Sequence, residues 1–236
     1  MPNATSFPGS VPEHDDRRPS AKEEGNYSIR ALGINRALNR PLAGLLVRAL
    51  HPTRVTPNQV TLAAFALGLA GAVFFFRGRP WAFAVGGVLA QLSSIVDCAD
   101  GMLARKRGQA SEFGATLDLM LDRINEYFLM AGMALGYYVY SGRERLLIFG
   151  LLATAFYFLQ TTVFYLMNSR PGIPRQGETA EERGWLMFGI FFFGVTNRID
   201  LAMLILPFFA VVALLLLVVK FYRHRDGQAD CRPTDG

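Results

Sequence analysis

The sequence carries two short acidic stretches, DCADGMLAR at residues 97–105 and GATLDLMLD at residues 114–122. Asp97 and Asp100 are three positions apart and Asp118 and Asp122 are four apart, so each pair shares one face of a helix. Small residues continue these faces at Gly101, Ala104 and Gly114. Two neighbouring helices are therefore predicted to present two carboxylates each, beside positions where a ligand can approach the backbone.

The apolar surroundings of these carboxylates limit what they can do. An ionised Asp at membrane depth costs at least ~2.5 kcal/mol on insertion scales, and mutual repulsion adds to this cost. Either most of them are protonated, or they pair with Arg105, Arg107 and Arg123, or cations hold them together. Three arginines hardly satisfy four such acids, and Glu126 adds a fifth. Carboxylates without nearby His or Cys favour hard ions such as Mg²⁺ or Mn²⁺. Because two such ions suit phosphate chemistry, phosphoryl transfer is the leading hypothesis.

The spacing resembles the signature of the CDP-alcohol phosphotransferase family. That signature, Asp-x2-Asp-Gly-x2-Ala-Arg-x8-Gly-x3-Asp-x3-Asp, is matched without departure from Asp97 to Asp122. The resemblance implies that Asp97 and Asp118 bridge two Mg²⁺ or Mn²⁺ ions, that Asp100 completes one metal site and that Asp122 completes the other. It also implies that Asp122 is the general base towards the acceptor hydroxyl, which must come within hydrogen-bond reach.

The resemblance further implies contacts to the CDP group. The candidates are Pro57, Asn58, Gln59, Val60, Gly101, Ala104, Arg105, Ser111 and Gly114. Some of these residues have a second interpretation. Gly101 and Ala104 are small enough to bring membrane helices together. Arg105 either binds the pyrophosphate or anchors a helix end at the membrane surface. Asn58 either contacts the nucleotide or caps the helix that begins near Pro57.

Arginines near the fifth apolar run are candidates for holding a phosphorylated acceptor, at Arg170, Arg175 and Arg183. The alternative is that they anchor the cytoplasmic side of the chain at the membrane.

The composition favours a membrane protein. Of 236 residues, 51% are hydrophobic and 18% are charged. The net charge of +5 does not indicate a nucleic-acid partner, because the basic residues lie between apolar runs. No cleavable signal peptide is expected, since residues 1–26 contain no apolar segment.

The order of polar and apolar runs predicts an all-α polytopic membrane protein with six transmembrane helices. Residues 1–26 are typical of a disordered polar tail, and residues 27–56 of an amphipathic juxtamembrane helix and turn, with Pro41 expected to kink or split the helix. Residues 57–223 form the predicted six-span domain, and residues 224–236 a polar tail. The spans are expected at 58–76, 81–104, 112–140, 144–168, from near Glu178 to 196, and at 199–222, with a basic turn at 105–108.

The distribution of Lys and Arg predicts the orientation. Six spans place both termini on one side, where 18 of the 24 basic residues gather, against five on the other side. The positive-inside rule then puts both termini and the turn between the second and third spans in the cytoplasm. The aspartates flank this turn, so the predicted active site faces the cytoplasm.

These observations predict a divalent-metal-dependent membrane enzyme of phospholipid or phosphodiester biosynthesis. The resemblance implies that it transfers a substituted phosphate from a CDP-linked donor, with CDP-diacylglycerol the first choice, to an alcohol, and releases CMP. Residues 35–41 and 56–61 also resemble the membrane domain of di-myo-inositol-phosphate phosphate synthases, which joins CDP-inositol to inositol phosphate. The alternatives from other classes are a cation-coupled transporter, which predicts an internal repeat, and a non-catalytic scaffold. Relatives in the family commonly form homodimers, so a homodimer is expected.

Overall fold

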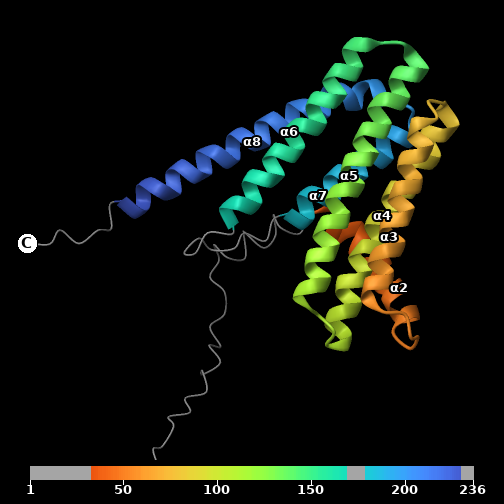
Figure 1. Ribbon diagram of the computed structural model, residues 1–236, viewed down its shortest axis with the longest axis vertical. Helices are drawn as coiled ribbons and strands as arrows, with labels where there is room; N and C mark the ends of the chain where they lie inside the picture. The colour runs from red at the N-terminus through yellow and green to blue at the C-terminus, as the bar shows by residue number, and fades with distance from the viewer. Residues whose placement is uncertain (1–32, 169–178, 230–236) are drawn as a thin grey trace, which may run out of the picture. The chain divides into compact units, whose positions relative to one another are not determined.

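The computed structural model describes residues 33–168 and 179–229, and this part of the chain contains helices and no strand. A π-helical turn, η1, is followed by seven α-helices (Figure 1). Their bounds are η1 Asn35–Asn39, α2 Arg40–Leu50, α3 Pro57–Phe76, α4 Pro80–Arg107, α5 Glu112–Ser141, α6 Glu144–Asn168, α7 Thr179–Val195 and α8 Ile199–Ala229. The expected tail at residues 1–26, and Arg170 and Arg175, lie outside the described residues.

The juxtamembrane segment is a helix that changes type just before Pro41. The Arg40 backbone N–H donates to the Asn35 carbonyl, a π-type bond, and α2 then begins with Pro41 in its first turn. A proline has no N–H to donate, so the first turn of an α-helix accommodates it. Pro41 therefore follows a widened turn, and the helix continues through it from Asn35 to Leu50; whether the helix is kinked there stays a prediction. Whether α2 lies on a membrane surface stays a prediction.

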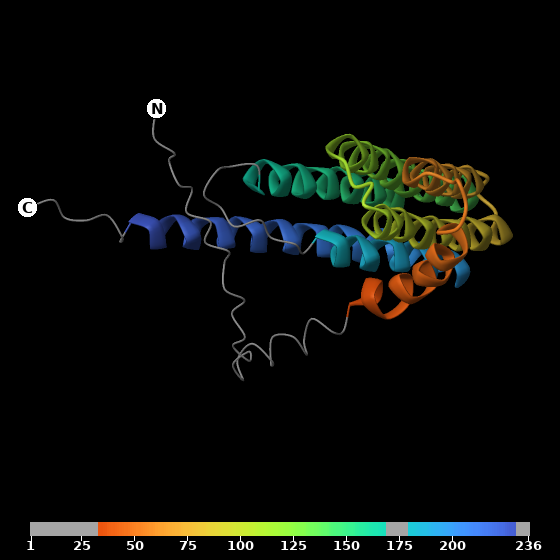
Figure 2. The same ribbon diagram turned by 90° about the horizontal axis from the view of Figure 1, so that it is seen from below.

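Buried amide side chains attach η1 to α4. Gln91 donates to the Asn39 amide oxygen at 2.7 Å, and Asn39 donates in turn to the Ser94 hydroxyl at 3.0 Å. The Cys98 thiol donates to the Asn35 amide oxygen at 2.9 Å. Figure 2 shows α2 on the side of α4 that faces away from α3. The juxtamembrane helix is thereby tied to the helix that carries Asp97 and Asp100.

The ends of α3 and α4 follow from local sequence signals. Thr56 and Gln59 form a capping box, in which each side chain accepts a backbone N–H of the other. The α4 helix ends at Gly108, which has a left-handed φ of 65°. The basic residues 105–107 form the last turn of α4, where cations favour the helix dipole, so the predicted basic turn at 105–108 is wrong for three of its four positions.

Glycines let α3 approach α4 and α5 closely. A Cβ added at Gly71 would lie 3.0 Å from the Gly86 carbonyl oxygen, and one at Gly132 would lie 2.8 Å from the Ala72 carbonyl oxygen. A core of fully buried side chains fills the space around these contacts, with Phe75, Phe83, Leu129, Met133 and Ile190 among them. The α7 helix packs on α4, and α8 pairs with α6. This packing fixes the separation of α4 and α5, on which the aspartates depend.

Three helices in the described part are long and apolar enough to cross a membrane, at Pro57–Phe76, Pro80–Arg107 and Glu144–Val163. Shorter apolar helical segments lie at Arg183–Val195 and Ile199–Phe209. The α5 helix is not among the three, and Asp118, Asp122, Arg123 and Glu126 all interrupt its apolar run. The chain is thus helical with three candidate membrane spans, and the expectation of six spans stays a prediction.

Candidate active site

Two neighbouring helices bring the aspartates together. Asp97 and Asp100 project from α4, and Asp118 from α5, with carboxylate oxygens that lie within 4.8 Å of one another. Thr61 on α3 donates its hydroxyl to Asp100 Oδ2 at 2.5 Å. Asp122 lies one turn further along α5, where 8% of it is exposed. The grouping expected from the sequence is therefore present for three carboxylates, with the fourth beside them.

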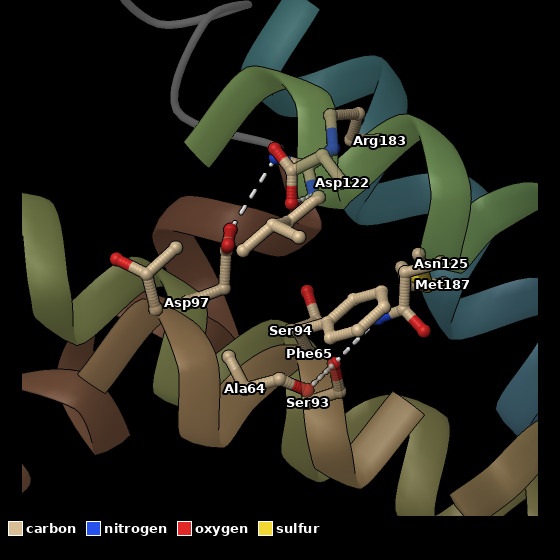
Figure 3. Close-up of a pocket in the computed structure, with 11 residues that line it drawn as sticks. Ala64, Phe65, Ser93, Ser94, Asp97, Asp122, Asn125, Arg183 and Met187 are labelled. Atoms are coloured by element: carbon tan, nitrogen blue, oxygen red, sulfur yellow. Dashed lines mark hydrogen bonds and ion pairs between the residues drawn. The ribbon is translucent and has the colours of Figure 1, made fainter. Parts of the chain in front are cut away.

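Arg183 from α7 connects the two helices at Asp122. Its Nη2 lies 2.5 Å from Asp122 Oδ1, and its Nη1 lies 3.3 Å from Asp97 Oδ2. Figure 3 shows Asp97 and Asp122 facing each other across a small pocket that the guanidinium group enters. This pocket has a volume of only about 10 Å³. Arg183 thus partly neutralises the acidic cluster.

The three aspartates suit a hard divalent cation. They offer oxygen ligands from two helices, and Asp118 Oδ1 is buried without a hydrogen-bond partner among the described residues. A buried carboxylate oxygen normally has a partner, so an unpaired one beside two other carboxylates is suited to a metal ion. The chain's own residues therefore fit Mg²⁺ or Mn²⁺ at this position.

A second, wider pocket adjoins the aspartates on the side of α3 and the α4–α5 turn. Its volume is about 180 Å³. It is lined by Pro57, Asn58, Thr61, Asp100, Gly101, Ala104, Arg105, Gln109, Ala110, Ser111, Gly114, Ala115 and Asp118. Seven of the nine residues predicted to contact CDP are in this lining, although they come from three separate parts of the sequence.

The two remaining candidates have other surroundings. Val60 is 3% exposed and packs in an apolar cluster with Val47 and Leu103. The Gln59 side chain accepts the Thr56 backbone N–H at 3.0 Å.

Because Thr56 caps α3, the alternative that Asn58 is the cap is wrong. Ser111 caps α5 by accepting the Gly114 N–H at 3.0 Å, and it also lines the wide pocket.

The arginines that were considered as partners of the aspartates have different partners. Arg107 donates to backbone carbonyls of the α2–α3 turn, including those of Leu50 and Val55. Arg123 lies 2.6 Å from Glu126. Arg105 lines the wide pocket. Arg183 pairs with Asp97 and Asp122 instead, so it neutralises acids that sequence reasoning left to other arginines.

Sequence reasoning included Thr61 in the resemblance at residues 56–61 but did not name it as a site residue. Thr61 lies four positions after Pro57, on the face of α3 that also carries the predicted nucleotide contact Asn58. This spacing is a signal that could have found it. Asn125 and Ser93 line the small pocket and are joined by a hydrogen bond of 3.0 Å (Figure 3), and no pattern in the sequence singles them out.

Residues 54–222 match the family described as CDP-alcohol phosphatidyltransferase. The chain belongs to this family. The match covers more than half of the 236 residues and includes every aspartate of the acidic cluster.

Several curated proteins are similar to this chain. A bifunctional IPC transferase and DIPP synthase of Rubrobacter xylanophilus is 42% identical over 103 residues, which are 44% of this chain and 23% of that protein. An archaetidylinositol phosphate synthase of Pyrococcus horikoshii is 32% identical over 89 residues, 38% of this chain and 46% of that protein. A phosphatidylinositol phosphate synthase of Mycolicibacterium smegmatis is 36% identical over 97 residues, 41% of this chain and 40% of that protein. In each comparison the chain spans less than half of the relative's length.

A solved structure shares the fold. The crystal structure of Mycobacterium tuberculosis phosphatidylinositol phosphate synthase with CDP-DAG bound aligns with a TM-score of 0.61 and 21% identity. The alignment covers 74% of this chain and 90% of that one. The helical arrangement described above is therefore a known fold, the one of that synthase.

Proposed function

We propose that this protein transfers the phosphatidyl or similar lipid-linked phosphate group of a CDP-linked lipid to inositol phosphate and releases CMP. One observation carries the proposal: the wide pocket with Arg105 and the fixed cation Arg183 lie on two sides of the same aspartate cluster. One side suits a nucleotide diphosphate, and the other suits a phosphorylated alcohol. The names of the two lipid-synthase relatives, archaetidylinositol phosphate synthase and phosphatidylinositol phosphate synthase, support inositol phosphate as the acceptor.

The donor is proposed to bind in the wide pocket. Gly101 and Ala104 leave the backbone of α4 open to the ligand, and Arg105 offers a guanidinium to the pyrophosphate. Asn58 and Ser111 offer polar groups to the cytidine from the starts of α3 and α5. Asp97, Asp100 and Asp118 would hold Mg²⁺ or Mn²⁺, with Asp122 beside them. Two such ions, when bound, neutralise the phosphate oxygens and the charge on the departing CMP.

The chemical step is a substitution at the lipid-linked phosphorus. The acceptor hydroxyl oxygen forms a bond to this phosphorus, and the bond from the phosphorus to the CMP oxygen breaks. Asp122 accepts the hydroxyl proton at Oδ2, while Arg183 donates to Oδ1. Lipid-linked phosphate ends on the acceptor, and CMP leaves with the electron pair.

Arg183 is proposed to hold the acceptor's phosphate. Its side chain is 20% exposed and lies beside the proposed base, Asp122. A guanidinium binds phosphate through paired N–H donors, which sets the orientation of the alcohol as well as its affinity. Arg170 and Arg175, which lie outside the described residues, remain candidates for the same role.

A second candidate donor is CDP-inositol. The R. xylanophilus relative, a bifunctional IPC transferase and DIPP synthase, supports it, since this chain is 42% identical to it over 103 residues. The reaction would have the same metal ligands, base and acceptor, and only the group attached to the donor phosphate would differ.

The arrangement in the membrane is part of the proposal. We propose six spans within a catalytic domain at residues 57–223, a surface helix at 27–56, and polar tails at 1–26 and 224–236. Both termini and the active site face the cytoplasm, and the protein acts as a homodimer. The family match at residues 54–222 supports the domain limits, and the excess of Lys and Arg on one side supports the orientation.

Release of CMP by the purified protein tests the function. With Mg²⁺ or Mn²⁺, CDP-diacylglycerol or CDP-inositol is combined with inositol phosphate, inositol, glycerol phosphate, serine or ethanolamine. CMP release that requires CDP-diacylglycerol and inositol phosphate together supports the proposal. Release with CDP-inositol alone as donor supports the second candidate. A transporter or a scaffold would release no CMP with any pair.

A further inference from the structure

Glu126 is a buried acid that the proposed reaction does not use. It lies on α5, one helical turn beyond Asp122, and none of its surface is exposed. Both of its carboxylate oxygens have cationic partners. Oε1 accepts from Arg183 Nε at 2.8 Å, and Oε2 lies 2.6 Å from Arg123 Nη1 and accepts from the Tyr157 hydroxyl at 3.1 Å.

The bond to Glu126 determines which atoms of Arg183 face the reaction centre. Because Nε is directed to Glu126, Nη1 and Nη2 are directed to Asp97 and Asp122. A guanidinium is planar and rigid, so fixing Nε fixes the plane and direction of both Nη groups. Without this bond, the long side chain could rotate away from the acceptor position.

Arg123 keeps the charge of Arg183 available. If Glu126 were paired with Arg183 alone, the pair would be neutral and would attract phosphate weakly. Arg123 shares the Glu126 charge from the other oxygen, and it also lies within reach of Tyr157 and Thr161 on α6, at 3.2 and 3.4 Å. Glu126, Arg123 and Arg183 alone carry a net charge of +1, and this charge faces Asp97 and Asp122, with which the Nη groups of Arg183 are also paired.

We propose that Glu126 is a positioning residue that holds the Arg183 guanidinium towards the acceptor's phosphate and so sets the preference for phosphorylated over unphosphorylated alcohols. The inference rests on the proposed function, in which Arg183 binds that phosphate. Glu126 touches neither substrate in this account and acts through Arg183.

The test compares inositol phosphate with inositol as acceptors for wild type and Glu126→Gln. We expect Glu126→Gln to raise the KM for inositol phosphate about tenfold or more, as loss of a supporting contact commonly does, and to change the KM for inositol less than about twofold. The preference for the phosphorylated acceptor then falls by the same factor. A merely structural role would lower turnover with both acceptors equally, and that result would overturn the inference.

Three measurements make the result specific. In an Arg183→Gln background, Glu126→Gln should change the KM less than about twofold, because the two residues act as one unit. Mn²⁺ binding, followed by electron paramagnetic resonance without substrates, should remain within about threefold of wild type. Tyr157→Phe, which removes one donor to Oε2 and leaves the Arg183 bond in place, should keep the wild-type preference. Three results would each overturn the inference: additive effects of Glu126→Gln and Arg183→Gln on the KM, loss of Mn²⁺ binding in Glu126→Gln, or a fall in acceptor preference in Tyr157→Phe as large as in Glu126→Gln.

Glu126→Gln removes the carboxylate that pairs with Arg123 and one of the three that pair with Arg183, which can prevent folding. Glu126→Asp is the second variant, because it keeps the charge and withdraws the carboxylate from Arg183 by one methylene. It should lower the same preference by a smaller factor, and an unchanged preference would overturn the inference. A wild type with no preference for inositol phosphate contradicts the proposed function. A wild-type preference that survives in both Glu126 variants contradicts only the role of Glu126.

Discussion

The two pockets beside the aspartates differ in what already occupies them. The wide pocket, about 180 Å³, is lined by small side chains, by Asp100 and Asp118 and by Arg105 at the α4 end. The small pocket, about 10 Å³, lies between Asp97 and Asp122 and is closed by Arg183. Thr61 lines both. The difference indicates that the wide pocket has room for a ligand as it stands, whereas the small pocket presents the guanidinium group of Arg183 to its ligand.

If both pockets serve one metal centre, loss of a shared ligand should have the largest effect. Asp118→Asn removes one charge from the three-carboxylate group and should lower CMP release at least about 1,000-fold, since a catalytic metal contributes several kcal/mol to the barrier. Mn²⁺ binding should weaken with it. Glu112→Gln, at an exposed position on the same helix, is the matched control and should retain wild-type activity. Normal turnover by Asp118→Asn would show that the cluster is not the reaction centre.

A change confined to the small pocket should separate chemistry from metal binding. Asp122→Asn removes the proposed base, and CMP release should fall about 100-fold to 1,000-fold. Because the three clustered carboxylates remain, Mn²⁺ binding should be weakened much less than in Asp118→Asn. The fold should be intact, as measured by thermal unfolding. Turnover at the wild-type rate would show that the assignment of the base is wrong.

Thr61 borders both pockets, so a change there should weaken both metal binding and CMP release, but less than the loss of an aspartate does. Thr61→Val keeps the shape of the side chain and removes the hydroxyl that donates to Asp100 Oδ2. Loss of such an orienting bond typically costs about tenfold in metal affinity or activity. Mn²⁺ titration and CMP release should both show it. In the control, Thr154→Val, the lost hydroxyl bonds the Gly150 carbonyl within α6, and neither quantity should change.

Filling the wide pocket should weaken the binding of the CDP-linked donor alone. This is the smallest of the four effects expected here. Ala104→Leu adds three carbon atoms at the pocket lining and should raise the KM for the CDP-linked donor about threefold to tenfold. The KM for inositol phosphate should stay the same. Ala66→Leu on the exposed face of α3 is the control for added bulk. An equal rise in both KM values would contradict the assignment of separate pockets to donor and acceptor.

Much of the helical framework was predictable because its signals are local. The helix predicted at 144–168 has these bounds in the structure, and those predicted at 58–76 and 112–140 agree within one residue at each end. Pro57, Gly108 and Ser111 mark helix ends through backbone conformation or a cap. The α8 helix continues to Ala229, beyond the expected end of its span at residue 222, because hydropathy marks the membrane boundary and not the end of the hydrogen-bonded helix.

Part of the candidate site was predictable for the same reason. Asp97, Asp100 and Asp118 were expected to meet, and their carboxylates do meet, because each helix places residues three or four positions apart on one face. Val60 and Gln59 were expected at the nucleotide and are used instead in core packing and in a helix cap. The sequence pattern covers all of residues 57–60 at the start of α3, whereas the fold directs only Pro57 and Asn58 into the wide pocket.

The sequence alone determined that two helices carry four carboxylates and that the chain belongs with CDP-alcohol phosphatidyltransferases, because short spacings and helical periodicity are properties of the local chain. Only the tertiary structure decided which basic side chain pairs with these carboxylates. Arg183 is 86 positions from Asp97 and reaches it because α7 packs on α4, and Glu126 lies behind it because α5 turns that face inward. Contacts over such separations depend on how the helices pack, and no spacing within a helix encodes them.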